Sequence, residues 1–209
     1  MNRPDFSMYL AHFAKDGALC SIDDPNYTYI AGLTAIQRLE KILREKSIKA
    51  TKMPWTGAHA VCFTECPWSS LIAHTKQYSP YGIGFSKQIV YSKHGGPAYY
   101  VRPDHLKKQL STGKFDKQLW PFVTPFSPSY RPNHMKGKYF STVDFSHERE
   151  WRVPHDFPFE YRDVAFIILK DYHDMAAFSK DLKDAIGRDK FILIDNYEHV
   201  EKLWPVHLV

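Results

Sequence analysis

Helical periodicity is confined to a few stretches of this sequence, and strand-like patterns fill most of the rest. The clearest helix is expected at 34–48, where apolar residues recur at helical spacing and Thr34 can cap the first turn. Further helices are expected at 66–78 and 174–186. Strands are expected at 6–14, 59–65, 81–90, 97–101, 164–170 and 190–195. Because the helices come early and late, with mostly strands between them, the pattern predicts an α+β fold and not regular βαβ winding.

The length and the proline distribution indicate one domain with a long internal loop. A chain of 209 residues is typical of a single domain, here expected to cover 1–209. Residues 121–147 show little periodicity, and four prolines there break any helix. A long aperiodic connection is usually functional or disordered, and the aromatic content of this one argues against disorder. An ordered loop at 121–147 is therefore expected.

Apolar runs and cysteines indicate a reducing compartment and no membrane span. No apolar run approaches the length of a spanning helix, and the first residues lack a signal-peptide pattern. Three cysteines are too few for a disulfide framework, so a cytoplasmic location is expected. Cys62 and Cys66 lie near His59 and His74, but no second paired set of zinc ligands exists, so no metal site is predicted.

The positive charge is concentrated in one segment. Residues 102–138 contain eight Lys or Arg residues and two Asp residues, while the whole chain has a net charge of +5. Aromatic residues are interleaved with these cations, a combination that suits a polyanion through phosphate contact and base stacking. The segment therefore predicts nucleic-acid binding, and the alternative is a solubilising surface over a local aromatic core.

A short stretch at 145–154, FSHEREWRVP, has an unusual polar face. As a strand it would place Glu148, Glu150 and Arg152 on one side. Trp151 and Val153 would lie on the other side, in the core. The polar face is then either solvated surface or the floor of a polar site. A histidine in the first strand, His12, by itself indicates no more than a backbone hydrogen bond, unless other polar groups converge on it.

Three stretches resemble a known family: HF at 12–13, AVCFTECPWSSLIAHTKQYSPYGIGFSK at 60–87, and EREWRVP at 148–154. They resemble the AbiGi-type abortive phage-resistance proteins of bacteria, which in turn look distantly like DarT-like ADP-ribosyltransferases. The resemblance covers most of residues 8–154. It implies a split β-sandwich with peripheral helices, and NAD bound in the cleft between two sheets.

The resemblance also implies site residues. His12 matches a polar position on the first strand, and Phe63 or Thr64 matches a position on the second. Tyr78 and Tyr81 both fit a tyrosine that stacks on nicotinamide, and Arg102 or Arg152 could bind NAD. Glu150 matches the main catalytic carboxylate, and Glu148 matches a residue that selects or activates the acceptor. The 121–147 loop would recognise the target.

The implied chemistry is consistent with these residue types. Cleavage of NAD at the nicotinamide–ribose bond passes through an oxocarbenium-like state. A carboxylate bonded to the ribose hydroxyl holds it more strongly as positive charge develops. Glu150 would supply that carboxylate, and Trp151 and Val153 would anchor its strand.

Three functions are compatible with the sequence. The first is an NAD-dependent ADP-ribosyltransferase of a phage-defence or toxin–antitoxin system, acting on nucleic acid or protein. The second is a non-catalytic, antitoxin-like protein that binds a cognate partner. The third is a nucleic-acid-binding domain built around 102–138. The sequence leaves open the acceptor, the partner and the oligomeric state.

Overall fold

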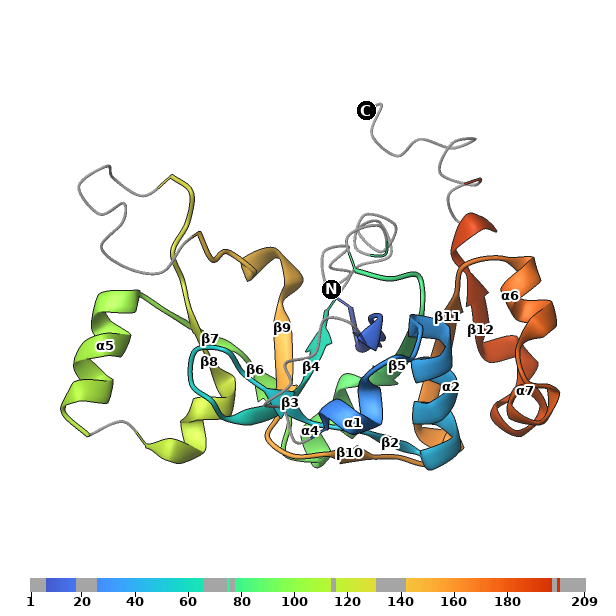
Figure 1. The fold of residues 1–209 in the computed structure, drawn as a ribbon, viewed down its shortest axis with the longest axis horizontal. Helices are drawn as coiled ribbons and strands as arrows, with labels where there is room; N and C mark the ends of the chain where they lie inside the picture. The colour runs from blue at the N-terminus through green and yellow to red at the C-terminus, as the bar shows by residue number, and fades with distance from the viewer. Residues whose placement is uncertain are drawn as a thin grey trace.

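The computed structural model describes residues 7–17, 26–65, 75, 78–113, 116–130, 142–196 and 199. Its centre is an eight-stranded sheet with the order β12-β11-β5-β1-β4-β9-β6, in which β3 pairs with β4 off this path (Figure 1). Neighbouring strands are antiparallel except β11 and β12. The strands are β1 (Tyr9–Phe13), β3 (Thr51–Lys52), β4 (His59–Thr64), β5 (Gly82–Ser86), β6 (Gly96–Pro97), β9 (Glu150–Val153), β11 (Val164–Leu169) and β12 (Phe191–Leu193).

Two further sheets have two strands each in the described part of the chain. One pairs β2 (Ser47–Ile48) with β10 (Phe157–Pro158), and the other pairs β7 (Tyr99–Val101) with β8 (Val123–Pro125). The helices are α1 (Tyr27–Ile30), α2 (Ala35–Glu45), α4 (Lys87–Ser92), α5 (Pro103–Ser111), α6 (Tyr172–Ala177) and α7 (Lys180–Ile186). Short 3₁₀ turns cover Lys117–Phe122, Ser146–Glu148, Tyr161–Asp163 and Arg188–Lys190. This mixed, mostly antiparallel arrangement confirms the α+β prediction.

The expected helix at 34–48 is α2, and its ends explain its length. Thr34 and Gln37 form a reciprocal capping box at the first turn. Lys46 adopts a left-handed conformation that ends the helix, so Ser47 and Ile48 continue as β2. Leu39 and Leu43 are fully buried, because the apolar face of the helix packs on the core beside the sheet.

The core beside this helix is aromatic. The rings of Phe63, Phe85, Phe157 and Phe159 meet edge to face or stacked, with centroids 4.9–6.5 Å apart. At Gly84 on β5, a Cβ atom would lie 2.2 Å from the Phe166 ring, so only glycine leaves room for that ring.

Several predicted boundaries are wrong. The strand expected at 81–90 ends at Ser86, whose side chain accepts a hydrogen bond from the Ile89 amide and starts α4. The strand expected at 97–101 divides between β6 and β7, which belong to different sheets. The helix expected at 174–186 is two helices, α6 and α7. The helix expected at 66–78 lies outside the described residues except for 75 and 78.

The expected strand at 145–154 is shorter than the alternation suggested. Arg149 has a φ of 45°, and the residues before it form a 3₁₀ turn, so the strand begins only at Glu150. Glu148 therefore precedes the strand that carries Glu150 and Arg152.

Residues 98–149 form what we call the excursion, which leaves the main sheet after β6 and returns at β9. The Ala98 amide donates to the Glu150 carbonyl at 2.8 Å, so the two ends of the excursion meet. It carries β7, α5 and β8, which lie apart from α2, α6 and α7 (Figure 1). The expected loop at 121–147 is partly regular, since it contains β8 and a two-residue bridge between Ser127 and Val143.

Candidate functional site

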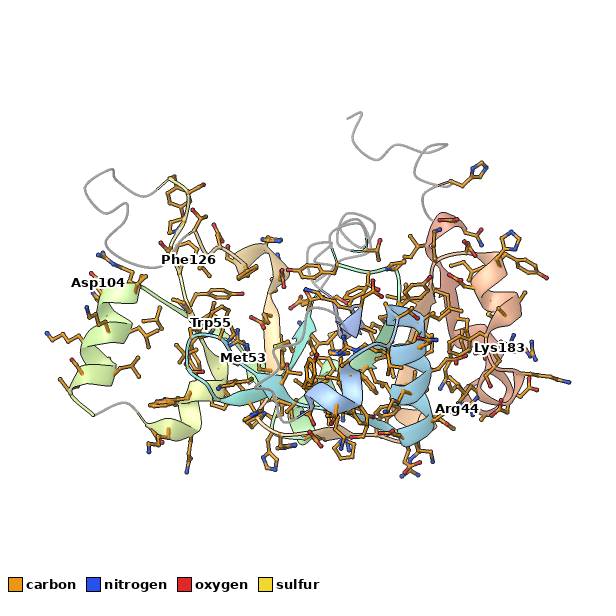
Figure 2. The ribbon with its side chains drawn as sticks, in the orientation of Figure 1. Arg44, Met53, Trp55, Asp104, Phe126 and Lys183 are labelled. Carbon is orange, nitrogen blue, oxygen red and sulfur yellow. The ribbon has the colours of Figure 1, made fainter. Side chains whose placement is uncertain are left out.

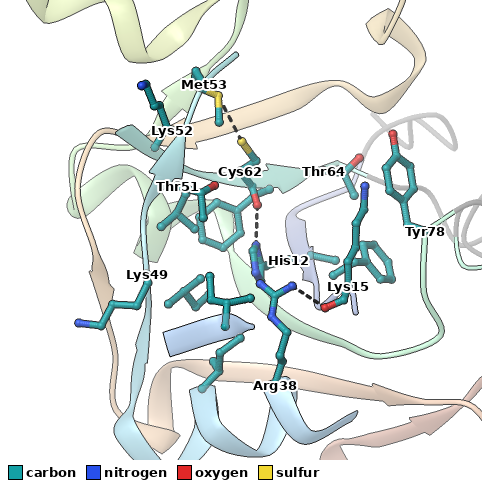
Figure 3. Close-up of a pocket in the computed structure, with 18 of the residues that line it drawn as sticks. His12, Lys15, Arg38, Lys49, Thr51, Lys52, Met53, Cys62, Thr64 and Tyr78 are labelled. Atoms are coloured by element: carbon teal, nitrogen blue, oxygen red, sulfur yellow. Dashed lines mark hydrogen bonds between the residues drawn. The ribbon is translucent and has the colours of Figure 1, made fainter. Parts of the chain in front are cut away.

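A cavity of about 670 Å³ lies beside β1 and β4, and α2 and β3 supply further lining residues (Figure 3). Six of the nine residues that the sequence analysis assigned to a site line it. They are His12, Phe63, Thr64, Tyr78, Glu148 and Glu150. Tyr81, Arg102 and Arg152 are not among the lining residues. The volume is in the range of small-molecule sites.

His12 reaches the cavity from the first strand. Its Nδ1 lies 2.8 Å from the Cys62 carbonyl oxygen, so Nδ1–H donates to that oxygen (Figure 3). Burial, opposed by this bond and helped by the nearby charges of Arg38 and Lys15, lowers the pKa of His12 to about 4. The ring is therefore neutral at pH 7, and Nε2 is left as a hydrogen-bond acceptor.

Glu148 lines the cavity with a titratable carboxyl group. The Tyr78 hydroxyl donates to its Oε1, and the ammonium of Lys15 lies 3.8 Å from the centroid of the Tyr78 ring. Burial and the neighbouring Glu150 carboxylate raise the pKa of Glu148 to about 7. The carbonyl of Glu148 accepts from the Thr64 hydroxyl at 2.6 Å, which fixes the turn before the strand.

Glu150 is held in place by Arg152. This contact explains why charged residues alternate with core residues in FSHEREWRVP. Arg152 is fully buried and binds both carboxylate oxygens of Glu150, at 2.9 and 2.7 Å. Its other donors reach the carbonyls of Pro121 and Val123 at 3.0 Å and the hydroxyl of Thr124 at 2.5 Å. The excursion covers Arg152, while Glu150 also lines the cavity, so this face is part of a polar site and not a solvated surface.

All five N–H donors of Arg152 have partners inside the protein. The residue was expected to bind NAD, but the structure gives it the position of a group that orients Glu150. Arg102, the other candidate, pairs with Asp104 at 2.8 Å on the excursion. We call the place where residues 121–124 of the excursion meet β9 the junction. Trp55 also lies there, and its Nε1 donates to the Val123 carbonyl at 2.6 Å (Figure 2).

Tyr81 lies away from the other predicted residues. Its hydroxyl donates to Asp174 of α6 at 2.8 Å, and its ring packs against the main core. Of the two tyrosines considered for stacking, the structure brings only Tyr78 to the cavity.

Cations of the cavity lining were missed by the sequence analysis. Five of them come from the segment after β1, from α2 and from the residues around β3. They are Lys15, Arg38, Lys41, Lys49 and Lys52. No site was assigned to the charged residues of the helix expected at 34–48. The signal available in the sequence was the spacing of Arg38 and Lys41, which puts them on one helix face.

The excursion presents basic and aromatic side chains to solvent. Lys107, Lys108 and Lys117 are exposed, and so are four large apolar residues. The latter are Tyr99, Leu110, Leu119 and Tyr130. Residues 114–115 and 131–138 of the basic segment lie outside the described residues, and nucleic-acid binding by 102–138 stays a prediction.

Metal binding and membrane insertion find no basis in the described residues. There, no group of three or more His, Cys, Asp or Glu residues is placed to hold a metal ion. Cys66 and His74, two of the zinc ligands considered, lie outside the described residues. Where the structure describes the chain, it has no helix whose length and apolar character would let it span a bilayer.

Comparison with models of known protein families gives a match. A family model described as "Putative abortive phage resistance protein AbiGi, antitoxin" matches residues 38–184. No curated protein and no solved structure matches the chain. The matched region runs from α2 to α7 and includes Glu148, Glu150 and the whole excursion.

Proposed function

Because the chain belongs to the AbiGi family, we propose that it is the antitoxin member of an abortive phage-resistance pair and acts by binding a cognate toxin. The observation that carries this proposal is the family match, which spans most of the main sheet as well as the excursion. Binding is also the function that needs no catalytic step from the residues described.

The excursion is the surface we assign to the toxin. Its exposed large apolar residues include Tyr99 and Tyr130, which are 56% and 77% exposed. Tyrosine and arginine side chains are enriched in protein interfaces because they bury much area and also form hydrogen bonds. The exposed lysines of α5, which belong to the same excursion, favour a toxin with an acidic contact surface.

The test is neutralisation of the partner. The tagged chain is purified from its bacterial host, and a protein that co-purifies at a stoichiometric ratio is expressed alone and together with the chain. We expect the partner alone to arrest growth and co-expression to restore it. The double variant Tyr99→Ser/Tyr130→Ser should lose the rescue, whereas Tyr172→Ser, 73% exposed on α6, should keep it. A chain that captures no partner and rescues no growth would contradict the proposal.

A second candidate function is ADP-ribosyl transfer from NAD, within a split β-sandwich of the ADP-ribosyltransferase type. It is favoured by the convergence on one cavity of six residues chosen from the family resemblance alone. In this mechanism Glu150, oriented by Arg152, stabilises the positive charge on the ribose, and Glu148 positions the acceptor. A neutral His12 would accept a hydrogen bond from a ribose hydroxyl.

Nicotinamide release separates the two candidates. The wild-type chain is incubated with NAD and cell extract, and both nicotinamide and ADP-ribose adducts are measured. A transferase releases nicotinamide, and Glu150→Gln abolishes the release, while Glu160→Gln, at an exposed carboxylate that pairs with Lys46, keeps it. A stoichiometric partner in the absence of any adduct favours the antitoxin.

A further inference from the structure

The cavity has a cationic wall that neither candidate function uses. Arg38 and Lys41 face it from α2, and Lys15 faces it from the segment after β1. Lys49 and Lys52 stand at its border, on the side away from Tyr78 (Figure 3). Five cationic side chains thus share the lining with three carboxylates.

The three carboxylates are engaged in other contacts. Asp16 accepts a hydrogen bond from the Ala35 amide at 2.7 Å, at the start of α2. Glu150 is bound by Arg152 through both of its oxygens. Glu148 accepts from Tyr78 and is half protonated near pH 7. Lys49 is paired with Asp156 at 2.8 Å, so four other cations stand against three carboxylates. Since one of these carboxylates, Glu150, is paired with Arg152, the net charge of the lining is positive.

The guanidinium of Arg38 is held in place at this wall. It donates to the Lys15 carbonyl and lies beside the His12 ring (Figure 3). Its charge, together with that of Lys15, contributes to the low pKa of His12, so the three groups share one electrostatic environment. A planar guanidinium with several donors matches the oxygens of a phosphate group better than a single ammonium does.

We propose that this cavity binds a phosphorylated small molecule, with a phosphate group at Arg38 and the hydroxyl groups at Glu148 and Glu150, where the Lys15 ammonium also lies over the Tyr78 ring. The cavity has the volume for a ligand of nucleotide size, and it joins a cationic wall to groups that accept hydrogen bonds from hydroxyls. The inference concerns binding alone. It deepens the second candidate function, because NAD is one such ligand, and it also holds for a ligand that is never turned over and does not depend on a toxin partner.

Calorimetric titration with three probes tests the proposal: adenosine diphosphate, inorganic pyrophosphate and adenosine. We expect the diphosphate and pyrophosphate to bind, and adenosine to bind at least about tenfold more weakly than the diphosphate. Arg38→Gln should weaken pyrophosphate binding about tenfold or more, which is the usual effect of losing a hydrogen bond to a charged group. Lys15→Gln supplies an independent variant, and thermal unfolding checks that both variants fold.

The matched control is Arg44→Gln on the same helix. Arg44 is half exposed, pairs with Asp181 of α7 at 3.0 Å and is not among the residues that line the cavity. It should leave binding unchanged. The proposal is overturned by an equal loss in both arginine variants, by adenosine binding as tightly as the diphosphate, or by no binding of either phosphorylated probe at millimolar concentration. A glutamate-rich peptide that binds as tightly as the diphosphate would overturn it too, since the cavity would then accept an acidic chain.

Discussion

The main sheet and the excursion are stabilised by different interactions. Around β5 and α2, buried side chains such as Phe85, Ile83 and Leu39 are apolar and fully enclosed. Where the excursion meets β9, the largest buried side chain is Arg152, and the contact consists of directed hydrogen bonds to Pro121, Val123 and Thr124. Apolar burial depends on area and shape, whereas a buried guanidinium depends on every one of its partners.

This difference has a functional side. Glu150 belongs to both regions, because its carboxylate lines the cavity and is bound by the arginine that holds the excursion. The position of the cavity carboxylate is therefore set by the junction. Variants at the junction should alter both stability and the cavity, and variants in the main sheet away from the cavity lining should alter stability alone.

Replacing the buried guanidinium should have the largest effect. Arg152→Met is expected to lower the free energy of unfolding by about 3–5 kcal/mol, because it removes the Arg152 donors from the buried Glu150 carboxylate and from the Pro121 carbonyl. Urea unfolding at pH 7 measures the loss. Arg188→Met, which removes an exposed i,i+4 pair with Asp184, should change stability by about 0.5 kcal/mol or less. Equal effects of the two variants would falsify the account of the junction.

A smaller loss is expected from one methyl group in the main sheet. Gly84→Ala should cost about 1–3 kcal/mol, because the added Cβ collides with the Phe166 ring. Gly96→Ala is the matched control, since the nearest atom to its Cβ, on Phe122, would lie at an ordinary 3.6 Å. Ligand or toxin binding by Gly84→Ala, measured at a temperature where it is folded, should equal that of the wild type. Altered binding would show that the two regions are not separable in this way.

The smallest effect is a pH dependence that arises at the cavity. The pKa of Glu148 is about 7 in the folded chain, above its ordinary value of 4.5. Between pH 4.5 and pH 7 the folded state therefore binds a proton that the unfolded state has released. Stability from this group is highest below pH 4.5 and falls as the pH rises through 7, by about 1–2 kcal/mol after allowance for partial solvent exposure.

Glu148→Gln should remove that fall. The urea midpoints of wild type and variant are compared at pH 5 and pH 8. The midpoint of the variant minus that of the wild type should be larger at pH 8 than at pH 5. His12, whose pKa of about 4 lies below its ordinary 6.5, acts in the opposite direction in acid, and it is present in both proteins, so it cancels in the comparison. A gap that is the same at both pH values contradicts the raised pKa.

The elements that the sequence predicted well are those specified by local pattern. Helix α2 carries its own cap and apolar stripe, and β4 and β11 carry their own apolar runs. The start of β9 was wrong because the left-handed Arg149 has no counterpart in strand alternation. Burial of Arg152 could not be predicted, since its partners at 121–124 lie 28–31 residues earlier in the chain.

The candidate site shows the same division. His12, Glu148 and Glu150 were chosen from the family resemblance, and the structure places them on one cavity. Arg38 and Lys15 were missed because a charged residue on an amphipathic helix or after a strand reads as solvated surface. These charged residues lie far apart in the sequence, and they line one cavity only because β1, α2 and β3 come together in the fold.

The hydrogen bond between Ala98 and Glu150 has a consequence for redesign of the chain. A segment whose entry and exit strands are already joined is a detachable insert, and a short turn could bridge β6 and β9 in its place. In such a shortened protein the guanidinium of Arg152 would lose the backbone oxygens of Pro121 and Val123 that accept its hydrogen bonds now. Excision therefore requires a second, compensating change at position 152, and the minimal scaffold is obtained only when both edits are made together.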